Sequence, residues 1–198
     1  MINSGLFATK VVEPHPTTVL QWFPMRVTYN RELKVKECLD QRGIENFIPM
    51  HYERVEVKGY RKMKLMPAIH NLIFIRSTKE ALIELKHTQK DCEPMRFMTR
   101  PVSVVGEGLP SEILVIPDRQ MENFLRVASV QDERVMFLDY SGFLHKEGRR
   151  VRVMEGCFAG VEGTLKRIKK NKHVVVQLEG VAAVAITYLS PSSLVLID

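Results

Sequence analysis

The chain has 198 residues, 45% of them hydrophobic and 26% charged, and its net charge of +6 permits contact with phosphate backbones without identifying a nucleic-acid-binding protein. No apolar run approaches the roughly 18 residues that cross a bilayer, and the N-terminus lacks the basic flank and apolar stretch of a signal peptide, so we expect a cytoplasmic protein without membrane partners. The three cysteines and six histidines follow no metal-ligand or catalytic spacing, and we therefore predict no cofactor, no metal site and no enzymatic activity.

A flexible N-terminal tail is predicted for residues 1–18, which mix prolines, threonines and glycine without a hydrophobic period. The run VLQWFPMRV, which begins at Val19, is typical of a β-strand. Pro24 interrupts this run. Because proline cannot donate a hydrogen bond to a neighbouring strand, we expect Pro24 at an edge or a bulge.

The first helix is predicted after Asn30, whose side chain suits the N-cap position. Apolar residues recur at helical spacing in this segment, at Val35, Cys38 and Leu39. Gly43 suits the end of the helix, because glycine readily adopts the left-handed conformation found there.

A basic β-hairpin is predicted between Arg54 and Leu65, where side chains alternate on either side of Lys58-Gly59. The preceding run, GIENFIPM, predicts a short strand, and residues 72–75 predict a buried one.

Two further helices follow. Residues 77–80 fit a capping box that opens the second helix, with Leu82 and Leu85 as apolar positions. The third follows Pro117, and the residues expected to face inward are Met121, Phe124 and Leu125. Residues 19–130 are thus predicted to form an α+β domain, an antiparallel sheet flanked by helices.

The pattern changes after residue 130. Residues 131–147 show no sustained period and are predicted to be a linker. Residues 148–198 contain short β-rich runs, VRV, TLKRI, HVVVQL and SLVLI, separated by glycines or polar turns. So short a chain with several strands usually closes into a small SH3-like barrel.

Three glycines mark the first turn of this predicted barrel, at positions 156, 160 and 163. Glycine can take φ > 0, which such a turn requires. We expect the alternating Val151 and Val153 to enter the core and Phe158 to be exposed at the turn.

The run RVRVMEGCFAGVEGTLKRI resembles the KOW motif of NusG-type elongation factors almost from end to end. The N-terminal half resembles the NusG N-terminal domain in the same order, through Trp22-Phe23, Arg26-Val27, the first helix, RGIENFIPM, the basic hairpin and LIFI. The resemblance covers residues 19–198 and is greatest to the UpxY branch, specialised antiterminators of capsular polysaccharide operons, through RVTYNREL, GIENFIPM and PAIHNLIFI. Residues 69–72, Ile-His-Asn-Leu, depart from the Phe-Pro-Gly-Tyr-type turn of most NusG proteins, which favours a specialised paralogue over a housekeeping factor.

This resemblance implies that the N-terminal domain binds the clamp helices of RNA polymerase and suppresses pausing. The positions that match the polymerase-binding surface are Trp22, Met25, Ile69, His70, Asn71, Leu72 and Phe74. Trp22 and Phe74 can equally be core residues, because aromatic side chains in strands are more often buried than displayed. We expect Leu72→Asp to abolish polymerase binding and to leave the fold intact, since it forces a charge into an apolar contact.

Specialised members of the family also read the displaced non-template DNA strand or a leader nucleic acid. The matching residues here are Arg31 and Lys34, at the start of the first helix. A solvated helix face is the alternative, because acidic residues interleave with them. A second candidate group for base stacking is formed by His51, Tyr52 and Arg54.

The family's small barrel recruits a small-subunit ribosomal protein or the termination factor Rho, and the matching residues are Phe158, Ala159 and Gly160. The basic run from Lys166 to Lys172 suits RNA binding by counterion release, or simply a charged, soluble loop. A KOW-type RNA-binding or ribosome-binding protein without control of polymerase is the alternative function. It would keep the barrel but would not need the N-terminal resemblance.

Overall fold

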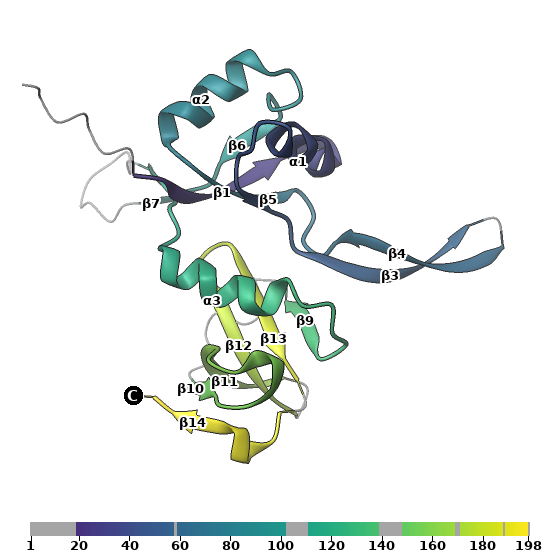
Figure 1. Cartoon of the computed structure of the whole chain (residues 1–198), viewed down its shortest axis with the longest axis vertical. Helices are drawn as coiled ribbons and strands as arrows, with labels where there is room; N and C mark the ends of the chain where they lie inside the picture. The colour runs from purple at the N-terminus through teal and green to yellow at the C-terminus, as the bar shows by residue number, and fades with distance from the viewer. Residues whose placement is uncertain are drawn as a thin grey trace, which may run out of the picture.

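The computed structural model describes residues 19–57, 59–101, 111–138, 148–168, 171–187 and 189–197. They form an α+β fold in which one helix, α3, lies between two antiparallel sheets (Figure 1). The described helices are α1 (Glu32–Asp40), α2 (Lys79–Thr88) and α3 (Asp118–Ala128), with short 3-10 helices at Thr28–Asn30, Gly156–Phe158 and Pro191–Ser193. None of these helices is long and apolar enough to span a membrane. The tail predicted at residues 1–18 lies outside the described residues.

The first sheet has the strand order β2-β5-β1-β6. Its strands are β1 (Gln21–Val27), β2 (Asn46–Phe47), β5 (Leu72–Ser77) and β6 (Met95–Phe97). Successive side chains of a strand point to opposite faces. One face packs against α1 and α2, and its apolar residues are Phe23, Met25, Val27, Ile73 and Ile75. The other face carries Trp22, Leu72 and Phe74.

Our prediction that Pro24 lies at an edge or a bulge is wrong, because β1 is an inner strand of the sheet. It stands opposite Phe74 of β5. On the other side, β6 pairs only with residues 25–27 of β1. Pro24 therefore lies just beyond the end of that ladder, where its missing N–H removes no regular hydrogen bond.

Both predicted N-caps are displaced by one residue. Arg31 occupies the N-cap of α1 without a side-chain hydrogen bond, whereas Asn30 has a φ of 51°. In α2 the N-cap is Thr78, whose Oγ1 accepts a hydrogen bond from the Ala81 amide at 3.2 Å. Gly43 has a φ of 65° just after α1, as predicted.

The predicted hairpin is confirmed as β3 (Met50–Val57) and β4 (Tyr60–Pro67), which pair only with each other. It projects away from the rest of the molecule (Figure 1). A second short ribbon pairs β7 (Thr99–Pro101) with β8 (Ser111–Ile113).

The second sheet has the order β14-β10-β11-β12-β13-β9. Its strands are β9 (Val135–Leu138), β10 (Arg149–Val153), β11 (Glu162–Ile168), β12 (Asn171–Leu178), β13 (Ala182–Ile186) and β14 (Leu194–Leu196). The edge strands β14 and β9 do not pair with each other, so the closed barrel that we predicted is not seen among the described strands.

Residues 135–138, which we predicted as part of the linker, pair with β13 as an edge strand of this sheet. The rest of the predicted linker beyond them, residues 139–147, lies outside the described residues. Val151 and Val153 enter the core as predicted.

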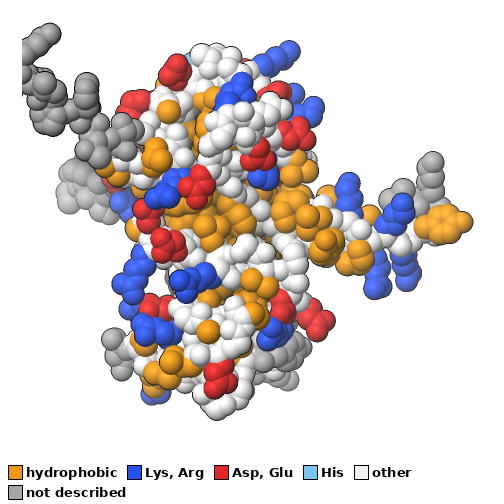
Figure 2. Space-filling model, in the orientation of Figure 1, with side chains coloured by type: hydrophobic (Ala, Val, Ile, Leu, Met, Phe, Trp, Pro, Cys, Tyr) orange, Lys and Arg blue, Asp and Glu red, His pale blue; other side chains and the backbone are white. Residues whose placement is uncertain are grey.

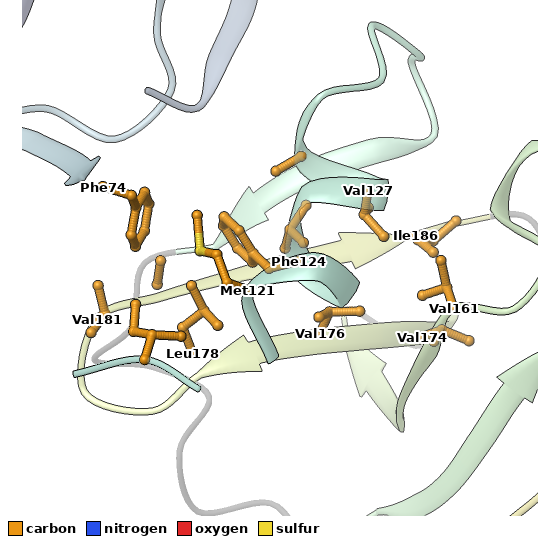
Figure 3. Close-up of a cluster of buried hydrophobic side chains, with 14 of the residues drawn as sticks. Phe74, Met121, Phe124, Val127, Val161, Val174, Val176, Leu178, Val181 and Ile186 are labelled. Carbon is orange, nitrogen blue, oxygen red and sulfur yellow. The ribbon is translucent and has the colours of Figure 1, made fainter. Parts of the chain in front are cut away.

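One hydrophobic core joins α3 to both sheets (Figure 3). Met121, Phe124 and Val127 form a fully buried stripe at helical spacing on α3. Phe124 meets Phe74 of the first sheet with ring centroids 5.7 Å apart. From the second sheet and its turns, the same core receives Val174, Val176, Leu178, Val181 and Ile186. Each such fully buried side chain stabilises the fold by about 1.5–3 kcal/mol.

Candidate functional site

Three of the residues predicted to bind polymerase lie together on one face of the first sheet. Trp22, Leu72 and Phe74 share this face because the register places Trp22 opposite Arg76 and Pro24 opposite Phe74. We call these three residues the covered face, since they are buried beneath α3 and the second sheet. An apolar face of this kind suits a protein partner only when it is uncovered.

Met25 does not belong to the covered face. It lies three residues after Trp22 on the same strand, so its side chain points to the opposite side of the sheet. There it is fully buried against α1 and α2. Met25 therefore shares no surface with Trp22, and its predicted contact with polymerase stays a prediction.

Leu72 is likewise a core residue with no exposed surface. A carboxylate at this position would be buried without a partner, at a cost of several kcal/mol. Our expectation that Leu72→Asp leaves the fold intact is therefore wrong, although the predicted contact with polymerase stays a prediction.

The turn at residues 69–71 borders the covered face. Ile69 is half-buried against the same core, whereas His70 is exposed. Asn71 has a φ of 60°, a conformation that asparagine tolerates better than most residues. Its Oδ1 accepts a hydrogen bond from the Asn30 amide at 3.2 Å, and its own amide donates to Glu32 Oε1 at 3.4 Å.

These hydrogen bonds place the start of α1 beside the turn. The two residues predicted to bind nucleic acid, Arg31 and Lys34, are therefore neighbours of the predicted polymerase-binding turn, and Lys34 is exposed. Sequence reasoning missed Tyr29, which is 85% exposed with a φ of 65°. An exposed aromatic residue next to predicted nucleic-acid contacts was the available signal.

Glu32 was also missed as a positioning residue. It is buried at the first turn of α1, where a carboxylate interacts favourably with the helix dipole. Because its Oε1 accepts from the Asn71 amide, Glu32 ties the 69–71 turn to the helix.

Phe158 is buried, with only 1% of its surface exposed, so our expectation of an exposed aromatic ring at the glycine turn is wrong. Gly156 and Gly160 do adopt positive φ angles, 77° and 82°, and the chain folds back between them. This turn directs Phe158 into the core. The Arg134 guanidinium also covers the ring, 5.1 Å from its centroid. Ala159 and Gly160 remain exposed.

Arg134 is held over Phe158 by Asp132. The guanidinium donates hydrogen bonds to both carboxylate oxygens of Asp132, at distances down to 2.6 Å. These bonds lower the pKa of Asp132 to about 2, so the carboxylate is ionised at neutral pH.

The basic run from Lys166 to Lys172, which begins in β11 and ends in β12, is not uniformly exposed. Lys166 is buried, and its Nζ donates to Gln177 Oε1 at 3.0 Å. Burial lowers the pKa of Lys166. Lys169 and Lys170 lie outside the described residues, whereas Arg167 and Lys172 are exposed. The run therefore presents less positive charge than its sequence suggests.

A polar contact fixes α3 to β11. The Asn123 side-chain amide donates to the backbone carbonyl of Glu162, and the Glu162 amide donates to Asn123 Oδ1 at 2.9 Å. The Glu162 carboxylate accepts hydrogen bonds from Arg119, Arg150 and Arg152. The hydrogen bond from Arg152 lowers the pKa of Glu162, with the three positive charges adding to the effect. Asn123, Glu162, Arg119 and Arg150, but not Arg152, line a groove of about 840 Å³ between the helix and the sheet.

Within the described residues, no group of three or more His, Cys, Asp or Glu side chains could hold a metal ion.

Two comparisons with known proteins gave a match. A family model described as transcription termination factor NusG matches residues 20–125, more than half of the 198 residues. A solved structure described as "Domain interaction in Thermotoga maritima NusG" is similar, with a TM-score of 0.42 and 16% sequence identity over 90% of this chain and 98% of that chain. No curated protein matches the chain.

Proposed function

The chain belongs to the NusG family of transcription factors, whose members act on RNA polymerase and are not enzymes, and we propose that it is a specialised antiterminator. It binds the clamp helices of RNA polymerase and promotes elongation through terminators, at a specific polysaccharide biosynthesis operon. The observation that carries this proposal is the covered face, Trp22, Leu72 and Phe74, which is aligned on one side of the first sheet beside the 69–71 turn.

The covered face cannot meet polymerase while the second sheet and α3 lie over it. The buried Phe74–Phe124 contact is part of this cover. Both α3 and the second sheet must therefore move away before Leu72 and Phe74 contact the clamp helices. The exposed His70 is the part of the surface that polymerase can reach first.

Nucleic-acid recognition fits the same side of the molecule. Arg31 and Lys34 lie beside the 69–71 turn, so a protein bound through that turn brings them close to the DNA in the elongation complex. There they contact the non-template strand or a leader nucleic acid. The exposed Tyr29 supplies a ring that can stack on a base.

The second sheet is the proposed site for a small-subunit ribosomal protein or Rho. Ala159 and Gly160 are accessible at the turn. Phe158 joins this surface only if Arg134 moves off its ring.

A transcription assay tests the proposal. The protein is added to cognate polymerase on a template with a known pause and terminator, with and without the operon's leader sequence. We expect readthrough that depends on the leader. A change in readthrough that does not depend on the leader would indicate a general elongation factor. Absence of both polymerase binding and readthrough would indicate an RNA-binding or ribosome-binding protein.

A surface variant tests the polymerase contact without disturbing the core. His70→Asp places a charge in the exposed turn and is expected to weaken polymerase pull-down at least tenfold. His87→Asp, at an exposed position near the end of α2, is the matched control. Equal pull-down by the two variants would remove the 69–71 turn from the interface.

A further inference from the structure

The hairpin β3–β4 has no role in either sheet. Among the described strands, its two strands pair only with each other, and every residue from Tyr60 to Leu65 is exposed. An isolated two-stranded ribbon is only marginally stable in water. A projecting arm that buries so little surface therefore calls for an explanation outside the stability of the fold.

The arm carries a net positive charge. Residues 50–67 contain five Lys or Arg and two Glu, a balance of +3 out of the net charge of +6. Among the described residues of the arm, Arg54, Arg61, Lys62 and Lys64 are exposed. None of these four forms an ion pair with another described residue. Figure 2 shows Lys and Arg side chains along this arm.

Large apolar side chains are interleaved with this charge. Tyr52, Tyr60, Met63 and Leu65 are between 41% and 75% exposed. The register places Tyr52 opposite Leu65 and Arg54 opposite Met63. Because side chains alternate along a strand, Tyr60, Lys62 and Lys64 point to the other face. Both faces are therefore amphipathic.

The base of the arm is anchored and acidic. Gln131 Nε2 donates to the Met50 carbonyl at 3.1 Å. A cavity of 480 Å³ at the base is lined by Tyr52, Met63, Asp132 and Glu133, among others. These carboxylates repel a polyanion at the base. In the outer part Glu53 lies opposite Lys64 and Glu56 lies opposite Arg61, but the basic residues outnumber these two carboxylates, so the outer part is the favourable contact.

We propose that the arm binds double-stranded DNA. The major groove of B-DNA, about 12 Å wide, admits a two-stranded β-ribbon. The major groove of A-form RNA is too narrow for side chains to enter. A single strand needs aromatic rings on one shared surface, but Tyr52 and Tyr60 lie on opposite faces of the ribbon. The basic side chains contact phosphates, and the interleaved apolar residues contact the groove.

A salt titration tests this proposal. Full-length protein is titrated against a fluorescein-labelled DNA duplex of mixed sequence, and binding is followed by anisotropy from 50 to 200 mM salt. Lys62→Gln/Lys64→Gln removes two phosphate contacts. Each contact contributes about 0.9 to the slope of log K against log salt. We therefore expect the slope to fall by about 1.8, which makes the loss of affinity over this range about tenfold smaller.

The matched control is Lys79→Gln/Lys90→Gln, which removes the same charge from two exposed positions at the two ends of α2. An equal change of slope in both double variants would overturn the proposal, because net charge alone would explain it. Tighter binding to the single strand or to an RNA duplex would also overturn it. The titration contains no polymerase, so its outcome is independent of the polymerase pull-down. In that pull-down, Lys62→Gln/Lys64→Gln should bind polymerase as the wild type does.

Discussion

At the scale of single residues, burial decides the chemistry of the three thiols. The Sγ atoms of Cys38 and Cys92 lie 3.2 Å apart in the core beneath α1, and both thiols are unoxidised. Burial, together with the hydrogen bond to Cys38, raises the pKa of Cys92 well above its usual 9.0. Cys157 is exposed.

This difference predicts the reactivity of the folded protein toward a thiol reagent. At pH 8, the raised pKa keeps Cys92 protonated, and the thiolate is the nucleophile. We therefore expect one fast equivalent with DTNB, from Cys157, and two more only after unfolding in guanidinium. Cys157→Ser should abolish the fast phase, and two fast equivalents in the wild type would contradict the burial of the pair.

At the scale of elements, one glycine sets how closely β11 and β12 approach. Gly163 lies in β11 opposite β12, and a Cβ added there would stand 2.7 Å from both the Val175 carbonyl oxygen and Val174 Cγ1. No unstrained side chain fits at such a distance, so the pairing of the two strands depends on glycine. Its φ is not positive, in contrast to our expectation for the third glycine of the turn.

Gly163→Ala should therefore destabilise the second sheet. Overpacking of this kind costs about 1–3 kcal/mol, measured as a lower urea midpoint with an unchanged m-value. A midpoint equal to that of the wild type would mean that β12 shifts at no cost.

At the scale of the whole molecule, α3 is the contact between two halves that share a core. Its apolar stripe faces both sheets, and Asn123 binds the backbone of Glu162 on the second sheet. Asn123 is not part of the covered face. Changing it weakens the docking of the second sheet, and with it the cover that this sheet and α3 together form over Phe74, without altering a residue of the proposed polymerase contact.

Asn123→Ala should increase polymerase binding. Losing both hydrogen bonds leaves the Glu162 backbone groups without these partners, at a cost of about 1–3 kcal/mol. When the covered form dominates, each 1.4 kcal/mol by which docking is weakened raises the apparent affinity for polymerase up to about tenfold. Pull-down titrations measure the affinity and small-angle scattering the domain docking, with Gln120→Ala on the same helix as control. Looser docking without tighter binding would mean that polymerase does not need the covered face.

Local patterns predicted much of this structure. The stripe of Met121 and Phe124, the buried pair Val151 and Val153 and the hairpin around Gly59 follow from spacing of 3.6 or 2 residues and from turn chemistry. The separation of Met25 from Trp22 was also within reach of sequence reasoning, since the alternation of a strand alone assigns them to opposite faces.

Other features depend on contacts between segments far apart in the chain. Phe158 is buried because the second sheet and α3 form a core around it, with Arg134, 24 positions earlier, also over its ring. Residues 135–138 form a strand because β13 offers them a free edge. Neither partner leaves a local signal in the sequence.

The three helices, the hairpin, their apolar faces and the family follow from the sequence, because they depend on residue spacing and on motifs. That Leu72 and Phe74 lie beneath α3 and the second sheet, and that the β3–β4 arm remains uncovered, follows only from the tertiary structure. The spacing of apolar residues in a sequence shows that one face of an element must be buried. Which surface buries it depends on the competition between all the apolar faces of the chain, and that competition is settled only when they pack.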